Sequence, residues 1–97
     1  MDFQTFAREH QDEIIRSTQE LIRIPSIEGT PCEGMPMGED VGQALNYVLD
    51  VCRQLGFRTK DLDGYAGYAE YGSGKEMVGI LCHLDVVPPG EGWTRTP

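Results

Sequence analysis

The sequence predicts an α/β fold, a three-layer sandwich with a mixed sheet, to which this chain contributes two helices followed by three strands. Two segments carry apolar residues at helical spacing. Residues 77–82 form an apolar run without alternation, which is typical of a strand covered on both faces. Helices that precede such a strand suit a layered sheet architecture. The 97 residues allow one domain with a modest core.

The first predicted helix covers residues 3–22. Asp2 is the expected N-cap, because its carboxylate can accept hydrogen bonds from the free amides of the first turn. Pro25 ends the helix, since proline excludes its predecessor from the helical region. His10 lies on the inner face and is interpreted as a half-buried histidine rather than a metal ligand. That face comprises Phe3, Ala7, His10, Ile14, Thr18 and Leu21.

A loop and a second helix follow. Residues 25–38 contain three prolines and three glycines, which indicates a loop, and its length is typical of functional loops. The second helix is predicted over residues 39–55, with acidic residues at its positive end and Gly56 as a left-handed cap. Glu33 lies near those acids, and the cluster is interpreted as helix-end electrostatics. The buried stripe comprises Val41, Ala44, Leu45, Val48, Cys52 and Leu55.

Three strands are predicted next. Residues 57–62 and 65–71 flank Asp63-Gly64, a pair typical of hairpin turns. Residues 72–75 form a second turn, because a phosphate-binding loop of similar composition would have to precede a helix. The third strand is the apolar run over residues 77–82, in which Cys82 is expected to be a small core residue.

Composition excludes several classes of partner. The chain has 16 acidic and 8 basic residues, a net charge of −8, which argues against nucleic-acid and anionic-membrane partners. Its longest apolar run is far below the roughly 20 residues of a membrane span. The start of the chain lacks the basic residues of a secretory signal. The three cysteines are widely scattered, which favours reduced thiols, and we expect a cytoplasmic protein.

The end of the buried strand is the place where chemistry is expected. Ligand groups gather at the carboxyl ends of strands in open α/β sheets, and His83 follows the third strand. In extended backbone His83 and Asp85 share one side, so the carboxylate could orient the imidazole while its other nitrogen binds a metal. Spacing alone favours a plain hydrogen-bonded corner, because catalytic zinc requires three protein ligands and an open position.

The residues from His83 to Pro88, with Gly90, Trp93 and Pro97 behind them, resemble the signature of the aminoacylase-type di-zinc peptidases. That family includes carnosinases, bacterial dipeptidases, succinyl-diaminopimelate desuccinylases and acetylornithine deacetylases. Residues 21–26 resemble the family's opening segment, as does the junction at residues 56–57. The Val-Val-Pro form at residues 86–88 is most similar to the dipeptidase branch. The resemblance implies that residues 1–97 are the N-terminal part of a longer catalytic domain.

The resemblance also implies a function, the hydrolysis of the amide bond of dipeptides by a metal-activated water. His83 corresponds to a ligand of one of two zinc ions, with manganese or cobalt as substitutes, and Asp85 to the catalytic aspartate that orients it. The substrate is a small peptide. The general base, the other ligands and a lid domain are expected beyond residue 97, and Glu91 is interpreted as an exposed loop acid rather than that base.

Two consequences and two alternatives complete the prediction. With a single metal ligand, residues 1–97 alone are expected to be inactive, and an unpaired apolar strand edge is expected to cause self-association. One alternative is an N-acyl amino acid deacylase of the same family. The other is a non-catalytic association module that keeps the fold.

Overall fold

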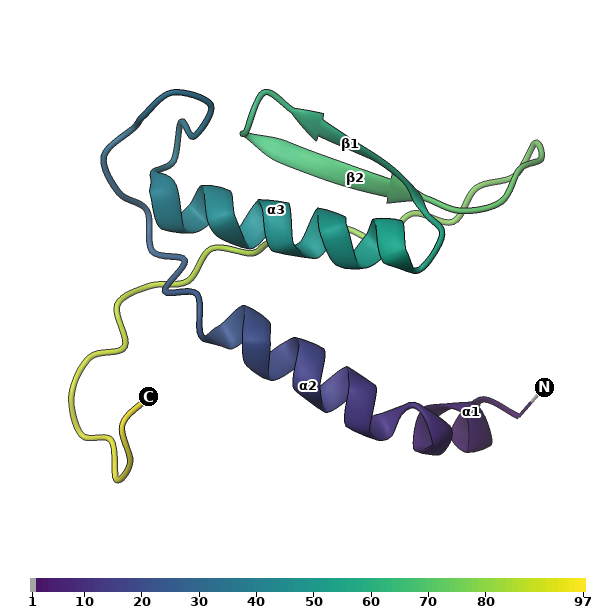
Figure 1. The fold of residues 1–97 in the computed structure, drawn as a ribbon, viewed down its shortest axis with the longest axis horizontal. Helices are drawn as coiled ribbons and strands as arrows, with labels where there is room; N and C mark the ends of the chain where they lie inside the picture. Colours follow the sequence, from purple (N-terminus) through teal and green to yellow (C-terminus); the bar gives the residue numbers. More distant parts are fainter. Residues whose placement is uncertain (1) are drawn as a thin grey trace.

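The computed structural model describes residues 2–97. They form three helices and one two-stranded antiparallel sheet, in the order α1 (Phe3–Glu9), α2 (Gln11–Ile22), α3 (Glu39–Gln54), β1 (Arg58–Leu62) and β2 (Ala66–Glu70). The hairpin of β1 and β2 lies along one side of α3, and α2 lies along the other (Figure 1). This is an α/β arrangement, as expected; the mixed three-layer sandwich stays a prediction. No helix in this described part is long and apolar enough to cross a membrane.

The single helix predicted over residues 3–22 is wrong, because the chain breaks at His10 into α1 and α2. There φ is −105° and ψ is 7°, outside the helical range. The His10 ring stacks on Phe6, with centroids 4.1 Å apart, and its Nδ1 donates to the Phe6 carbonyl over 2.9 Å. The Phe6 carbonyl also accepts from the His10 amide over 3.1 Å, so the ring bond adds to the backbone bond at this junction. The half-buried position expected for His10 is confirmed.

The predicted N-cap at Asp2 is confirmed. Its carboxylate accepts hydrogen bonds from the Gln4 amide at 3.0 Å and from the Thr5 hydroxyl at 2.9 Å. The Thr5 hydroxyl, and after it the Gln4 amide, lower the pKa of the Asp2 carboxyl below its ordinary value. Bonds of this kind favour the charged form, so Asp2 caps the helix as a carboxylate.

α3 agrees with the predicted helix to within one residue, and it carries the core. Gly56 follows it with φ at 92°, as expected of a left-handed cap. Ala44 is fully buried and Leu49 is 5% exposed. The predicted stripe omitted Leu49 and included Leu55, which is 59% exposed, so this part of the prediction is wrong. The reason is the position of the hairpin, which packs on the side of α3 that Leu49 faces.

The hairpin turn is confirmed at Asp63 and Gly64, whose φ values are 56° and 76°. The strands run in register from Arg58 opposite Glu70 to Leu62 opposite Ala66. The Asp61 carboxylate accepts from the Gly64 amide over 2.7 Å and supports the turn. A side chain at Gly64 would collide with the carbonyl oxygen of Gly34, so the loop before α3 lies directly against the turn.

The third predicted strand does not form among the described residues. Residues 77–82 have no regular secondary structure, and the turn at residues 72–75 therefore leads to no paired strand. A strand of this composition requires hydrogen-bonding neighbours and two covering layers, which residues 2–97 do not supply. Cys82 is exposed rather than a core residue. The large apolar side chains of the segment are also exposed: Met77 80%, Val78 92%, Ile80 91% and Leu81 99%.

We expect Leu49→Ala to lower the free energy of unfolding by about 2–4 kcal/mol, because it leaves a cavity between α3 and the hairpin. Leu55→Ala makes the same change at the exposed C-cap position that follows α3 and should cost less than about 0.5 kcal/mol. Urea unfolding followed by circular dichroism measures both. Equal losses in the two variants would contradict the assigned core.

We expect the 97-residue chain by itself to self-associate through residues 77–82, because they expose apolar side chains beside unpaired backbone groups. Light scattering over a concentration series should give a mass that rises with concentration. Leu81→Lys should reduce that rise, whereas Thr30→Lys, which adds the same charge at another exposed position, should not. A monomer at every concentration would show that these residues do not associate.

Candidate functional site

The structure brings His83 and Asp85 together. Nδ1 of His83 lies 3.0 Å from the backbone carbonyl oxygen of Asp85 and 3.2 Å from its Oδ1. A carbonyl oxygen can only accept, so Nδ1 carries the proton in this contact. With the proton on Nδ1, the nitrogen that can offer a lone pair to a metal is Nε2, on the side of the ring turned away from Asp85. The hydrogen bond expected from the spacing of the two residues is therefore present, and their catalytic and metal-binding roles stay predictions.

Both side chains of this pair are open to solvent. The His83 side chain is 82% exposed and the Asp85 side chain is 63% exposed. A hydrogen bond between side chains at such exposed positions contributes little to stability, because water competes for both groups. Both side chains are thus accessible to a ligand. The contact between them adds little to the stability of the fold.

A zinc ion fits one donor of this site, the Nε2 atom of His83. Imidazole nitrogen is a common zinc ligand, and a carboxylate on the opposite ring nitrogen is its usual supporting partner. Residues 2–97 contain no group of three or more histidine, cysteine, aspartate or glutamate side chains that could hold a metal ion. The described residues could therefore offer a metal ion at most one ligand with its orienting group, and they do not form a complete zinc site by themselves.

The segment that carries the pair is attached to the loop after α2. The hydroxyl of Ser26 donates to the carbonyl oxygen of Leu84 over 2.8 Å, and the Val86 amide donates to the carbonyl oxygen of Ser26 over 2.9 Å. Ser26 is 4% exposed, so it is a buried polar residue. No individual role for Ser26 was predicted from the sequence. Its position directly after Pro25, at the end of the segment that resembles the family's opening, could have marked it.

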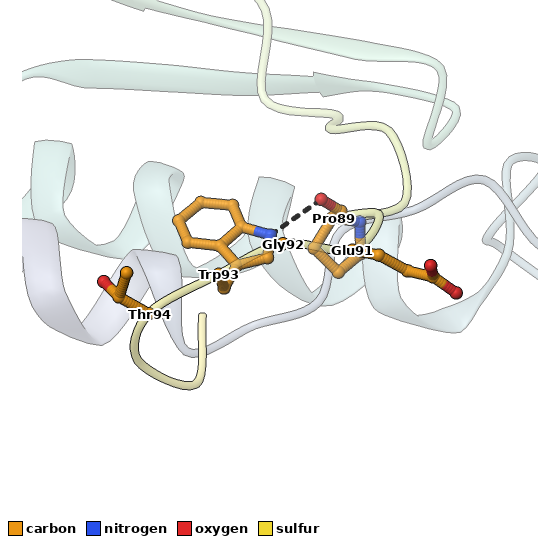
Figure 2. Close-up of a pocket in the computed structure, with 5 residues that line it drawn as sticks. All are labelled: Pro89, Glu91, Gly92, Trp93 and Thr94. Atoms are coloured by element: carbon orange, nitrogen blue, oxygen red, sulfur yellow. Dashed lines mark hydrogen bonds between the residues drawn. The ribbon is translucent and has the colours of Figure 1, made fainter.

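The loop after the pair is closed by Trp93. Its indole Nε1 donates to the carbonyl oxygen of Pro89 over 2.8 Å, and an open hollow lies beside this contact (Figure 2). In Figure 2 the Glu91 side chain points away from Trp93, and Glu91 is exposed, in agreement with its interpretation as a loop acid. Neither His83 nor Asp85 lines the hollow, so it is separate from the candidate site. Its lining consists of Pro89, Glu91, Gly92, Trp93 and Thr94.

Two of the three residues of the predicted acidic cluster lie at the helix end, as expected. Glu39 and Asp40 occupy the first turn of α3, where their charges oppose the positive end of the helix dipole.

Comparison with known proteins relates the chain to curated bacterial proteins. No family model matches the sequence. It is 48% identical over 89 residues to a Bacillus subtilis protein named "Putative dipeptidase YtjP", which is 90% of this chain and 19% of that protein. A Staphylococcus aureus protein of strain USA300 with the same description is 38% identical over 92 residues, 93% of this chain and 20% of that protein. The chain spans about a fifth of the length of the curated relatives that it matches. It is thus a relative of proteins named as dipeptidases.

Proposed function

We propose that this chain is the N-terminal part of the catalytic domain of a metal-dependent dipeptidase, which hydrolyses the amide bond of dipeptides. The observation that carries the proposal is the His83 ring, which Asp85 holds by Nδ1 with Nε2 free. The similarity to proteins named as dipeptidases supports the substrate class. The family resemblance of residues 83–88 supports the aminoacylase-type di-zinc site.

In this proposal His83 is the metal ligand and Asp85 orients its ring. Nε2 of His83 binds zinc, or manganese or cobalt in its place. Oδ1 of Asp85 accepts a hydrogen bond from Nδ1–H, which fixes the tautomer and raises the basicity of Nε2. A bound zinc ion supplies a Lewis acid for the substrate carbonyl and a water of lowered pKa. The exposure of both side chains leaves Nε2 accessible to a metal ion and a small peptide.

The proposal includes a contribution from the rest of a longer protein. A catalytic zinc site needs three protein ligands, and a general base must lie within hydrogen-bond reach of the water. Residues 2–97 offer one ligand, so we expect no hydrolysis by the 97-residue chain alone. Relatives about five times as long have room for the missing groups. All three cysteines are free, which supports a reducing compartment, and we propose the cytoplasm.

We expect His83→Ala in the full-length protein to lose bound zinc and nearly all dipeptide hydrolysis, because it removes a ligand atom. Asp85→Asn keeps the shape of the side chain and removes its charge, so it should cost about 10–100-fold in zinc affinity or activity. Metal analysis of the purified protein and amine release from dipeptides measure these effects. N-acyl amino acids assayed in parallel distinguish a deacylase from a dipeptidase.

His10→Ala is the matched control, since it makes the same change at the other histidine of the chain, which lies at the junction of α1 and α2. It should keep zinc content and hydrolysis at the level of the unmodified protein. The proposal is wrong if a folded His83→Ala protein hydrolyses dipeptides at the normal rate, or if His10→Ala loses as much zinc as His83→Ala does.

A further inference from the structure

We infer that Ser26 is a positioning residue of the candidate site, and that its buried hydroxyl holds the backbone around Asp85 so that His83 keeps its orientation. The expected effect on metal binding rests on the proposed function. The expected effect on the orientation of His83 rests only on the hydrogen bonds of Ser26. The bond of the Ser26 hydroxyl joins residues 58 positions apart in the sequence.

Ser26 faces Asp85 in the hydrogen-bond register of a parallel strand pair. In such a pair a residue accepts from the amide that follows its partner and donates to the carbonyl that precedes its partner. The Ser26 carbonyl accepts from Val86, which follows Asp85. The Leu84 carbonyl, which precedes Asp85, accepts from the Ser26 hydroxyl rather than from the Ser26 amide. The hydroxyl therefore takes the place of a backbone donor.

The amide of Ser26 is not free for that bond. It donates to the Ile24 carbonyl over 2.8 Å, and the next amide, of Ile27, donates to the Pro25 carbonyl over 2.6 Å. These are two successive turns of the three-residue type. A partly buried Leu84 carbonyl would lose its donor without the hydroxyl, which is unfavourable inside a protein. The hydroxyl of Ser26 therefore donates to Leu84 in place of the Ser26 amide, which already donates within the first turn.

The peptide unit between Asp85 and Val86 transmits this constraint to the histidine. Its carbonyl and its N–H lie in one plane and point in opposite directions, because the bond is trans. The N–H is fixed by the Ser26 carbonyl at 2.9 Å. The carbonyl of the same unit accepts from Nδ1 of His83 at 3.0 Å. An altered Ser26 contact would therefore turn the acceptor away from the ring and release Nε2 from its position.

The experiment compares three variants of the full-length protein. Ser26→Ala removes the hydroxyl, Ser26→Thr keeps it, and Ser73→Ala makes the same deletion in an exposed loop. Zinc affinity is measured by competition with a chelator. Hydrogen exchange of the Val86 amide and the ring nitrogen shifts of selectively labelled His83 are measured on the metal-free protein. These two readouts do not depend on activity.

We expect Ser26→Ala to weaken zinc binding about 10–100-fold, the range found when a residue that supports a metal ligand is replaced. Exchange of the Val86 amide should become about tenfold faster, since local opening becomes easier. The ring shifts of His83 should move from the Nδ1-protonated form toward a mixture. Ser26→Thr should restore all three readouts, and Ser73→Ala should leave them unchanged.

The inference is overturned if Ser26→Ala lowers the melting temperature while Val86 exchange, the His83 shifts and zinc affinity stay normal. It is also overturned if Ser26→Thr fails as completely as Ser26→Ala, because packing and not the hydroxyl would then be decisive. A full-length protein that binds no zinc and cleaves no dipeptide would refute the proposed function. In that case Val86 exchange and the His83 shifts still decide the role of Ser26.

Discussion

The packing of α3 against the hairpin depends on the missing side chain at Gly67. A Cβ atom there would lie 3.0 to 3.2 Å from the methyl groups of Leu45 and Leu49, closer than such atoms normally approach. Without it, Leu49 lies against the backbone of β2 and becomes a buried residue of a small core. This contact sets which side of α3 faces inward. It leaves the opposite side to α2, whose Ser17 carbonyl and Glu20 carboxylate accept hydrogen bonds from the Tyr47 hydroxyl of α3.

The candidate site is held by a second, independent set of interactions, the hydrogen bonds of Ser26. The candidate residues lie outside all regular elements, so no helix or strand orients them. Their position comes from backbone hydrogen bonds to Ser26, directly after Pro25. In the tight turns at this proline, the amides of Ser26 and Ile27 donate to nearby carbonyls. The Ser26 hydroxyl is therefore the group that donates to the distant Leu84 carbonyl. A loop thus connects the end of α2 with the part of the chain where chemistry is expected.

Features encoded within a few residues could be predicted from the sequence. The cap at Asp2 and the turn at residues 63–64 depend on neighbours one to three positions away. The break at His10 was missed because the helical spacing of apolar residues continues across it. The strand at residues 77–82 was predicted from its composition, but a strand exists only with hydrogen-bonded neighbours, which residues 2–97 do not provide. Local pattern alone does not reveal such partners.

The same distinction applies to the site. The hydrogen bond between His83 and Asp85 could be predicted, because the two residues lie in one short segment. The contact of Ser26 joins segments far apart and has no periodic signature, so it was visible only in three dimensions. Yet a hydrogen bond between two side chains this exposed contributes little, because water competes for both groups. We infer that the orientation of the ring comes chiefly from the peptide plane after Asp85, and hence from the loop residue Ser26 that holds this plane.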